Sequence, residues 1–291
     1  MPITTASDIP LPLHIVALVL LAAVLHATWN AVIKAGEDRV LTLALVIGTG
    51  SVLGLPVLPF VPVPAAESWF YLLLSFLLHL GYFFFLLQAY KVGDLSHVYP
   101  VARGAAPLLV AGGGAVFAGE VLPPAALAGL LLASLAIASF AFERGLATPR
   151  QTKPLVFGLV TAVFISSYTV TDALGVRLSG SPLGFIAWLF LISGVPLVGY
   201  ALIARPGALG PYARTHWKAV LLGGTICALG YALVIWALSF GPMAYVSALR
   251  ETSVVFAVLI GWIVLGEPLG GRRVAASVLV VAGIAIMNLA G

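Results

Sequence analysis

Long stretches of this chain contain no charged side chain, and this absence constrains the fold more than any other feature. Residues 40–66, 178–204 and 219–249 contain no Asp, Glu, Lys or Arg. Of the 291 residues only 8% are charged and 62% are hydrophobic, whereas about a quarter of the residues of a soluble domain are charged. So few charges cannot cover a water-facing surface, and the sequence predicts an integral membrane protein.

Proline, glycine and charged residues divide the hydrophobic runs into candidate transmembrane helices. A helix needs roughly 20 apolar residues to cross the hydrocarbon core of a bilayer. The chain is long enough for ten such spans, which we place at residues 13–35, 39–61, 67–91, 97–118, 122–142, 154–177, 182–204, 216–240, 243–265 and 271–290. The expected fold class is therefore an all-α integral membrane protein with ten transmembrane helices.

Several classes of function are excluded by composition. The single cysteine, Cys227, rules out an internal disulfide and a cysteine-based metal cluster, and we expect neither a metal nor a cofactor. The basic pI of about 9.3 comes from a few loop cations, so no nucleic-acid partner is expected. Residues 1–12 contain Asp8 but no Lys or Arg, which is not typical of a cleaved signal peptide.

The two halves of the chain share an ordered series of matching residues. Leu80-Gly81-Tyr82 recurs as Leu229-Gly230-Tyr231. An arginine followed at equal spacing by a glutamate also occurs in both halves, as Arg103 with Glu120 and Arg250 with Glu267. Chance alignment of helices rich in Ala, Leu and Gly is the alternative explanation. We interpret the series as two repeats, residues 1–147 and 148–291.

Five spans in each repeat would make the second repeat enter the membrane from the opposite side to the first. Inverted repeats of this kind are typical of transporters, which bind substrate near the midplane where the repeats meet. We therefore expect a 5+5 inverted-topology repeat around a central cavity. Two near-equivalent halves can exchange conformations, and this exchange would open the cavity to one side of the membrane and then to the other.

The distribution of cations predicts the orientation in the membrane. Ten spans place both termini on one side, where Arg177 is the only loop cation. Apart from Arg177 and the intramembrane Arg103 and Arg250, the remaining eleven of the 14 Lys and Arg residues fall on the other side. Because short cytoplasmic loops are enriched in Lys and Arg, the termini are predicted on the exterior (periplasmic) side of the cell inner membrane.

The paired segments resemble a known transporter repeat. Ala102-Arg103 through Gly119-Glu120, and Ala248-Leu249-Arg250 through Leu265-Gly266-Glu267-Pro268-Leu269, resemble the EamA repeat of the drug/metabolite transporter superfamily. The first copy departs from it at Val121, where the family prefers proline. The resemblance implies a ten-helix fold and export of amino acids or other small metabolites. Within the superfamily the chain is most similar to aromatic amino-acid exporters of the YddG type, although members of the family keep their termini in the cytoplasm.

Polar and aromatic residues inside the predicted spans are the candidates for a substrate site, because polar groups in a bilayer face a cavity or another helix. His26, Trp29 and Asn30 share one helical face, and Tyr168 and Asp172 repeat this spacing in the sixth span. Hydrogen bonding between helices is the alternative role for these residues. We expect Asp172 near the membrane edge.

Aromatic residues repeat in the third and eighth spans, where His79, Tyr82 and Phe83 share a face and Tyr231 is followed by Trp236. An aromatic surface suits an amphipathic solute, since ring stacking contributes about 0.5–1.5 kcal/mol per pair and ring faces attract an ammonium group. Simple packing between helices is the alternative. The complete set of predicted cavity-lining residues is His26, Trp29, Asn30, His79, Tyr82, Phe83, Tyr99, Arg103, Tyr168, Tyr231, Trp236, Arg250 and Glu251.

Two arginines are predicted within the membrane. A buried arginine at mid-bilayer costs at least about 2.5–3.5 kcal/mol, so Arg103 and Arg250 each need a partner. One of them could bind a substrate carboxylate, or both could snorkel or bond the ends of neighbouring helices. Glu120 and Glu267 are expected to cap the following helix or to dock onto Arg272 and Arg273. A proton-coupled mechanism would use His26, His79 or Glu251, and uncoupled transport fits the sequence equally well.

The sequence therefore favours a transporter that acts as a monomer, with a small-molecule substrate and the lipid bilayer as its partners. Another cargo, such as a drug, a sugar or a nucleotide sugar, is the first alternative, although a phosphorylated cargo would favour more cations in the cavity. An intramembrane enzyme is disfavoured because the spans contain no His-Glu-x-x-His, Gly-x-Ser-x-Gly or paired aspartates. A channel is disfavoured because no filter-like loop or ring of charges occurs.

Overall fold

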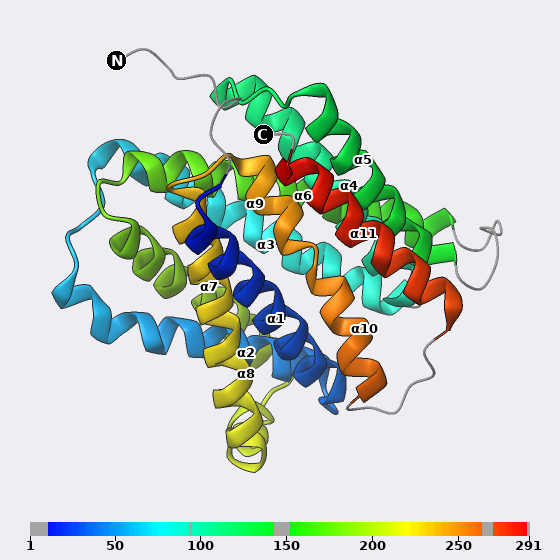
Figure 1. Ribbon diagram of the computed structural model, residues 1–291. Helices are drawn as coiled ribbons and strands as arrows, with labels where there is room; N and C mark the ends of the chain where they lie inside the picture. Colours follow the sequence, from blue (N-terminus) through cyan, green and yellow to red (C-terminus); the bar gives the residue numbers. More distant parts are fainter. Residues whose placement is uncertain (1–10, 93–94, 143–151, 264–269, 290–291) are drawn as a thin grey trace.

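The computed structural model describes residues 11–92, 95–142, 152–263 and 270–289 (Figure 1). Every secondary-structure element in this part is a helix. The α-helices are α1 (Leu13–Ala35), α2 (Arg39–Gly54), α3 (Trp69–Val92), α4 (Leu95–Ala118), α5 (Pro124–Ser139), α6 (Thr152–Leu178), α7 (Pro182–Ala204), α8 (Leu209–Leu238), α9 (Met243–Arg250), α10 (Ser253–Ile263) and α11 (Gly271–Leu289).

Nine stretches of the described chain are long and apolar enough to cross a membrane, and α5 is a shorter apolar helix. The short 3₁₀ helix Phe140–Phe142 extends α5 and brings this segment close to membrane length. Consistent with an even number of spans, α1 begins and α11 ends near the same end of the bundle (Figure 1), which we call the terminal face. The predicted all-α membrane fold is confirmed.

Local sequence signals explain where several helices begin. The carboxylate of Asp38 accepts hydrogen bonds from the N–H groups of Val40 and Leu41, at 2.9 and 3.1 Å, and so caps α2. The hydroxyl of Ser181 accepts the N–H of Gly184 at 3.1 Å, with a proline at the first position of α7. Such signals allowed α1 and α7 to be predicted with their observed bounds.

Two spans differ from the prediction. Helix α8 begins at Leu209, earlier than expected, and bends at His216, where φ is −110° and ψ is 18°. The ninth span is interrupted at Glu251 and Thr252, so that α9 and α10 are separate helices. At this break the hydroxyl of Thr252 donates to the carbonyl of Leu249 at 2.7 Å, and such side-chain bonds compete with regular helical hydrogen bonding.

Small residues bring neighbouring helices into close contact. Helices α5 and α11 pack together along one side of the bundle (Figure 1). Where they cross, a Cβ added at Gly283 would lie 2.6 Å from the carbonyl oxygen of Gly129, and a Cβ at Gly129 would lie 2.5 Å from that of Gly283. Helices α2 and α7 make a similar contact, in which the hydroxyl of Ser51 donates to the carbonyl of Phe190 at 2.6 Å. Membrane helices commonly use small residues in this way.

The principal packing partners follow a regular scheme. Helix α6 packs against α3 and α4, while α1 packs against α8 and against α9 and α10. In the order of the ten spans, α1 corresponds to α6, α2 to α7, α3 to α8, α4 to α9 with α10, and α5 to α11. Exchanging each helix for its counterpart converts the contacts of α6 into those of α1. The α2–α7 and α5–α11 pairs stay unchanged. Two inverted five-span halves would produce this scheme, and the division into residues 1–147 and 148–291 stays a prediction.

Candidate functional site

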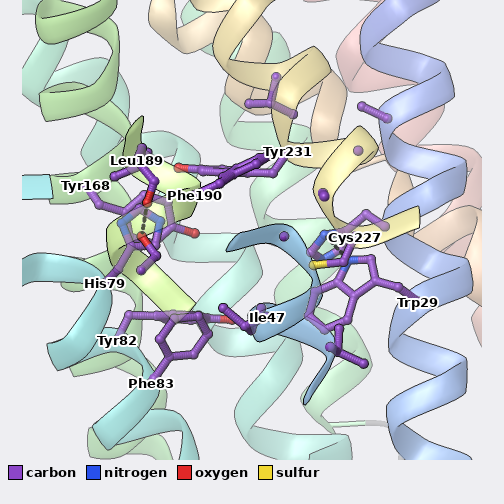
Figure 2. Close-up of a pocket in the computed structure, with 18 of the residues that line it drawn as sticks. Trp29, Ile47, His79, Tyr82, Phe83, Tyr168, Leu189, Phe190, Cys227 and Tyr231 are labelled. Carbon is purple, nitrogen blue, oxygen red and sulfur yellow. Dashed lines mark hydrogen bonds between the residues drawn. The ribbon is translucent and has the colours of Figure 1, made fainter. Parts of the chain in front are cut away.

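A cavity lies in the middle of the bundle, between helices that are far apart in sequence. It contains about 860 Å³ of space, part of it open to the outside. Its wall is formed by residues of α1, α2, α3, α6, α7 and α8, together with Arg250 at the end of α9. Most of this wall is aromatic or aliphatic (Figure 2).

Aromatic rings from three helices form one side of the cavity. The imidazole of His79 on α3 stacks on the ring of Tyr168 on α6, with 4.1 Å between ring centroids. Tyr231 on α8 meets His79 edge-on at 5.5 Å, and Tyr82 meets Tyr168 edge-on at 5.6 Å. Figure 2 shows Trp29 across the cavity from this cluster, beside Cys227. A flat apolar group could therefore lie between aromatic faces.

Two polar groups of this wall are already bonded within the protein. The indole N–H of Trp29 donates to Nδ1 of His26 at 3.2 Å. Nδ1 of His79 lies 2.9 Å from the carbonyl oxygen of Ser75, which fixes the orientation of the imidazole ring. These bonds leave mainly ring faces toward the cavity.

Asp172 lies beneath the aromatic wall, and its expected place near the membrane edge stays a prediction. Its side chain is fully buried, and its Oδ2 accepts a hydrogen bond from the hydroxyl of Tyr231. Its Oδ1 has no hydrogen-bond partner among the described residues. The spacing from Tyr168 correctly indicated the helix face on which Asp172 lies.

The two intramembrane arginines have different surroundings, although both are only 3% exposed. Arg103 on α4 is bonded across the bundle: its Nε lies 2.6 Å from Oε2 of Glu251, and its Nη2 donates to the hydroxyl of Ser253 at 2.8 Å. Nε of Arg250 lies 3.8 Å from Oε1 of Glu251. Nε and Nη2 of Arg250 have no hydrogen-bond partner among the described residues, and Arg250 lines the cavity.

This arrangement makes Arg250 the strongest candidate for a ligand contact. A guanidinium group taken out of water without hydrogen-bond acceptors is costly, and a bound anion would supply them. The expectation that both arginines snorkel or bond helix ends is wrong for Arg250, whose two unbonded nitrogens remain buried. For Arg103, the described partners include Glu251, between α9 and α10, and Ser253 at the start of α10.

The structure brings eight of the predicted site residues to the cavity wall: His26, Trp29, His79, Tyr82, Phe83, Tyr168, Tyr231 and Arg250. Whether they contact a substrate stays a prediction. The side chain of the remaining aromatic candidate on α4, Tyr99, lies outside the described residues.

Four predicted residues lie elsewhere. Asn30 donates to the carbonyl of His26 at 2.7 Å, within its own helix. Trp236 packs on Phe240, at 5.4 Å between centroids, because it lies more than one helical turn beyond Tyr231. Arg103 and Glu251 pair with each other behind the wall. Consequently α4 contributes none of the described lining residues, contrary to the expectation for the fourth span.

Helices α2 and α7 supply part of the wall that the sequence analysis missed. Their lining residues include Ile47, Gly50, Phe190 and Ser193. These small and apolar side chains are indistinguishable in the sequence from lipid-facing ones. The glycines and serines at the α2–α7 crossing are a usable signal, because they indicate which faces of the two helices approach each other.

Glu120 has a different partner from the one expected. Its Oε1 accepts a hydrogen bond from Arg177 at 2.6 Å, and its Oε2 accepts the N–H of Met243 at 2.7 Å. It therefore bonds α6 and α9 and does not dock onto Arg272 or Arg273. Glu267, the counterpart of Glu120, lies outside the described residues.

Comparison with known proteins supports a transporter fold. Residues 152–289 match the EamA-like transporter family, which belongs to the drug/metabolite transporter superfamily. None of the curated proteins compared with the chain matches it. A crystal structure of a protein with 22% identical residues is similar, with a TM-score of 0.74, over 94% of this chain and 95% of that one. At this identity the likeness shows the fold alone.

These findings establish a multi-pass membrane protein whose residues 152–289 match the EamA-like transporter family. The match to the family covers the second of the two predicted repeats. The narrower similarity to aromatic amino-acid exporters stays a prediction.

Proposed function

We propose that this protein transports small amphipathic carboxylates, above all amino acids with aromatic or other neutral side chains, by alternating access. The observation that carries the proposal is Arg250, a buried guanidinium that lines an aromatic cavity and has two nitrogens without a described hydrogen-bond partner. Its guanidinium would bind the substrate carboxylate. The proposed direction is export, with the termini on the exterior side, and the proposed functional unit is the monomer.

The wall of the cavity supports an apolar or aromatic side chain as the other end of the substrate. The rings of His79, Tyr168 and Tyr231 offer faces for stacking, and each aromatic pair contributes about 0.5–1.5 kcal/mol. A substrate ammonium group would be attracted to the same faces. Amino acids combine these three groups in one small molecule.

A phosphorylated cargo fits the cavity less well. Arg250 is the only lysine or arginine among the described lining residues, whereas a phosphate group carries up to two charges and favours several cations. A sugar offers hydroxyl groups, and the described wall presents few polar groups to bond them. These cargoes are tested as competitors.

The decisive experiment is counterflow in liposomes with the purified protein. Vesicles loaded with unlabelled phenylalanine, tyrosine or leucine should accumulate the labelled amino acid, and loading with a sugar phosphate should not produce this accumulation. Arg250→Gln should raise the half-saturating concentration of the amino acid about tenfold to a hundredfold, the loss expected for a charge-assisted hydrogen bond. Tyr82→Ala and Tyr231→Ala should also weaken transport.

Trp236→Phe is the matched control, because Trp236 is an aromatic residue of α8 outside the cavity wall. It should transport like the wild type. Accumulation of a sugar phosphate or a dye, with none of any amino acid, would refute the proposed cargo. If Arg250→Gln raised the half-saturating concentration equally for amines that lack the carboxylate, this would show that Arg250 does not bind the carboxylate.

A further inference from the structure

Two buried arginines share one carboxylate unequally. Glu251 lies 2.6 Å from Nε of Arg103 but 3.8 Å from Nε of Arg250. We infer that Arg103 is a positioning residue: it holds Glu251 away from Arg250 and thereby leaves the Arg250 guanidinium available to a substrate carboxylate. This inference rests on the proposed function and identifies what makes the cavity selective for carboxylates.

The break in the ninth span creates this arrangement. Glu251 lies between the end of α9 and the start of α10, where the helix is interrupted. Arg250 and Glu251 are adjacent at this break, and Nε of Arg250 lies 3.8 Å from Oε1 of Glu251. Arg103 reaches the break from α4 and is fixed there by a second bond, at 2.8 Å, to the hydroxyl of Ser253.

The charges of this cluster do not balance. Arg103, Arg250 and Glu251 are all buried, with exposures of 3%, 3% and 1%, so within this trio two cations share one carboxylate in a region of low dielectric constant. The other carboxyl group that faces Arg250 is that of Asp172, which is bonded by Tyr231 and forms no ion pair with Arg250 in the described part of the chain. A substrate carboxylate at Arg250 would restore the balance locally.

Removal of Arg103 should therefore impair binding at a group that Arg103 does not touch. With Arg103 absent, Arg250 is the only cation of this cluster left for Glu251, and the 3.8 Å separation can close into a direct ion pair. A substrate carboxylate would then have to compete with an internal one. Removal of Glu251 acts in the opposite direction, because it leaves Arg250 without any rival acceptor in the cluster.

The test is a cycle of four proteins: wild type, Arg103→Met, Glu251→Gln and the double variant. The half-saturating concentration in counterflow is measured for phenylalanine and for phenethylamine, which lacks the carboxylate. Arg103→Met should raise the value for phenylalanine about tenfold to a hundredfold and leave that for phenethylamine within about twofold. Glu251→Gln should keep or improve phenylalanine affinity, and the double variant should return to within about threefold of wild type.

A merely structural role for Arg103 predicts a different pattern. The double variant would then be impaired at least as much as Arg103→Met, and both substrates would be affected alike. Either result would overturn the inference, as would a tenfold loss of phenylalanine affinity in Glu251→Gln. If Arg103→Met does not fold, Arg103→Lys replaces it. Lysine keeps a cation beside Glu251 and should preserve phenylalanine affinity, so a loss as large as that of Arg250→Gln would refute positioning by charge.

A second measurement separates this inference from the proposed function. Cys227 is the only cysteine in the chain and lines the cavity, so protection of its thiol from a maleimide reports binding without transport. Benzoate, a simple aromatic carboxylate, should protect the wild type, Glu251→Gln and the double variant, but not Arg103→Met. If amino acids are not transported but benzoate protects Cys227 in this set of variants, the proposed cargo is wrong and the role of Arg103 stands. If amino acids are transported and this pattern of protection is absent, the role of Arg103 is refuted.

Discussion

Arg177 and Glu120 form an ion pair of 2.6 Å that joins the two halves of the chain at the terminal face. Arg177, at the end of α6, also donates to the carbonyls of Leu238, at the end of α8, and Gly241, at 2.9 and 2.7 Å. Glu120, between α4 and α5, accepts the N–H that begins α9. Movement of the α8–α9 end away from the α4–α5 connection would break these bonds.

Glu120→Ala should therefore loosen the terminal face. Loss of two hydrogen bonds, one of them to a cation, should lower the free energy of unfolding by about 1–3 kcal/mol. It should also increase labelling of Cys227 by an impermeant maleimide added at the terminal face. Thermal unfolding in detergent and labelling of oriented vesicles measure the two effects. Glu67→Ala, at an exposed glutamate before α3, is the control. Equal labelling of Cys227 in the two variants would contradict a role of Glu120 in closing the terminal face.

Gly283→Ala should destabilise the contact between α5 and α11. The added Cβ would lie 2.6 Å from backbone atoms of both Gly129 and Ala133, so the helices would have to separate and lose packing contacts. Gly112→Ala, on α4, is the matched control because its Cβ would meet nothing within 4 Å, and alanine favours a helix by about 1 kcal/mol. The melting temperature should fall for Gly283→Ala and not for Gly112→Ala. Equal melting temperatures would refute close backbone contact.

Asp38 should make stability depend on pH in the acid range. Burial by itself raises the pKa of Asp38, but hydrogen bonds from Arg205, Leu41 and Val40 outweigh it and hold the pKa below its ordinary value. A depressed pKa contributes stability above the unfolded-state value, near 3.9, and this contribution is lost as the pH falls through the folded-state pKa.

Asp38→Asn should therefore unfold at a lower temperature than the wild type at pH 7, and the difference should shrink below about pH 4. Because Arg205 is half exposed, salt should also reduce the difference. Thermal unfolding from pH 3 to pH 7 at two salt concentrations measures both effects. A difference that does not change with pH would show that the carboxylate charge is not responsible.

The helices of this protein could be predicted from its sequence because each depends on local chemistry. A membrane span must bond its own backbone groups, so uncharged runs bounded by proline or a capping residue such as Asp38 identify it. The cavity was predictable only where a residue carries a polar or aromatic group, as His79 and Tyr168 do. Ile47 and Gly50, which complete the wall, carry no such signal.

The difference between the two arginines could not be predicted. Arg103 and Arg250 are matched in the two predicted repeats, and although Glu251 follows Arg250 directly, the sequence does not show which arginine it pairs with. Their roles diverge because the ninth span breaks at Glu251 and the fourth continues past Arg103. The ion pair between Arg103 and Glu251 joins residues that are far apart in the sequence, so only the packed structure shows it.

Orientation is tested by a reporter fused to the C-terminus. The cations Arg39, Arg205 and Arg272 lie at the ends of α2, α7 and α11 that face away from the termini, and the cytoplasmic side is enriched in such cations. A fluorescent protein that matures only in the cytoplasm should stay dark, and a phosphatase that is active only outside it should be active. The opposite pair of results would place the termini inside the cell.

The hydrogen bond between Tyr231 and Asp172 should couple the contributions of the two residues to the free energy of unfolding. Tyr231→Phe removes the donor from a carboxyl group that is fully buried and whose other oxygen already lacks a described partner. An unsatisfied buried polar group costs about 1–3 kcal/mol, whereas replacing both partners by apolar groups can be nearly neutral.

The free energy of unfolding should therefore fall by about 1–3 kcal/mol for Tyr231→Phe in the wild-type background, and by much less when Asp172 is already replaced by leucine. Unfolding in detergent of the two single variants and the double variant gives this coupling as the departure from additivity. Tyr200→Phe, at a tyrosine that is 45% exposed on α7, should change stability little. Additive effects of the two substitutions would mean that the hydroxyl of Tyr231 does not stabilise Asp172, and the aromatic wall would then be held by ring packing alone.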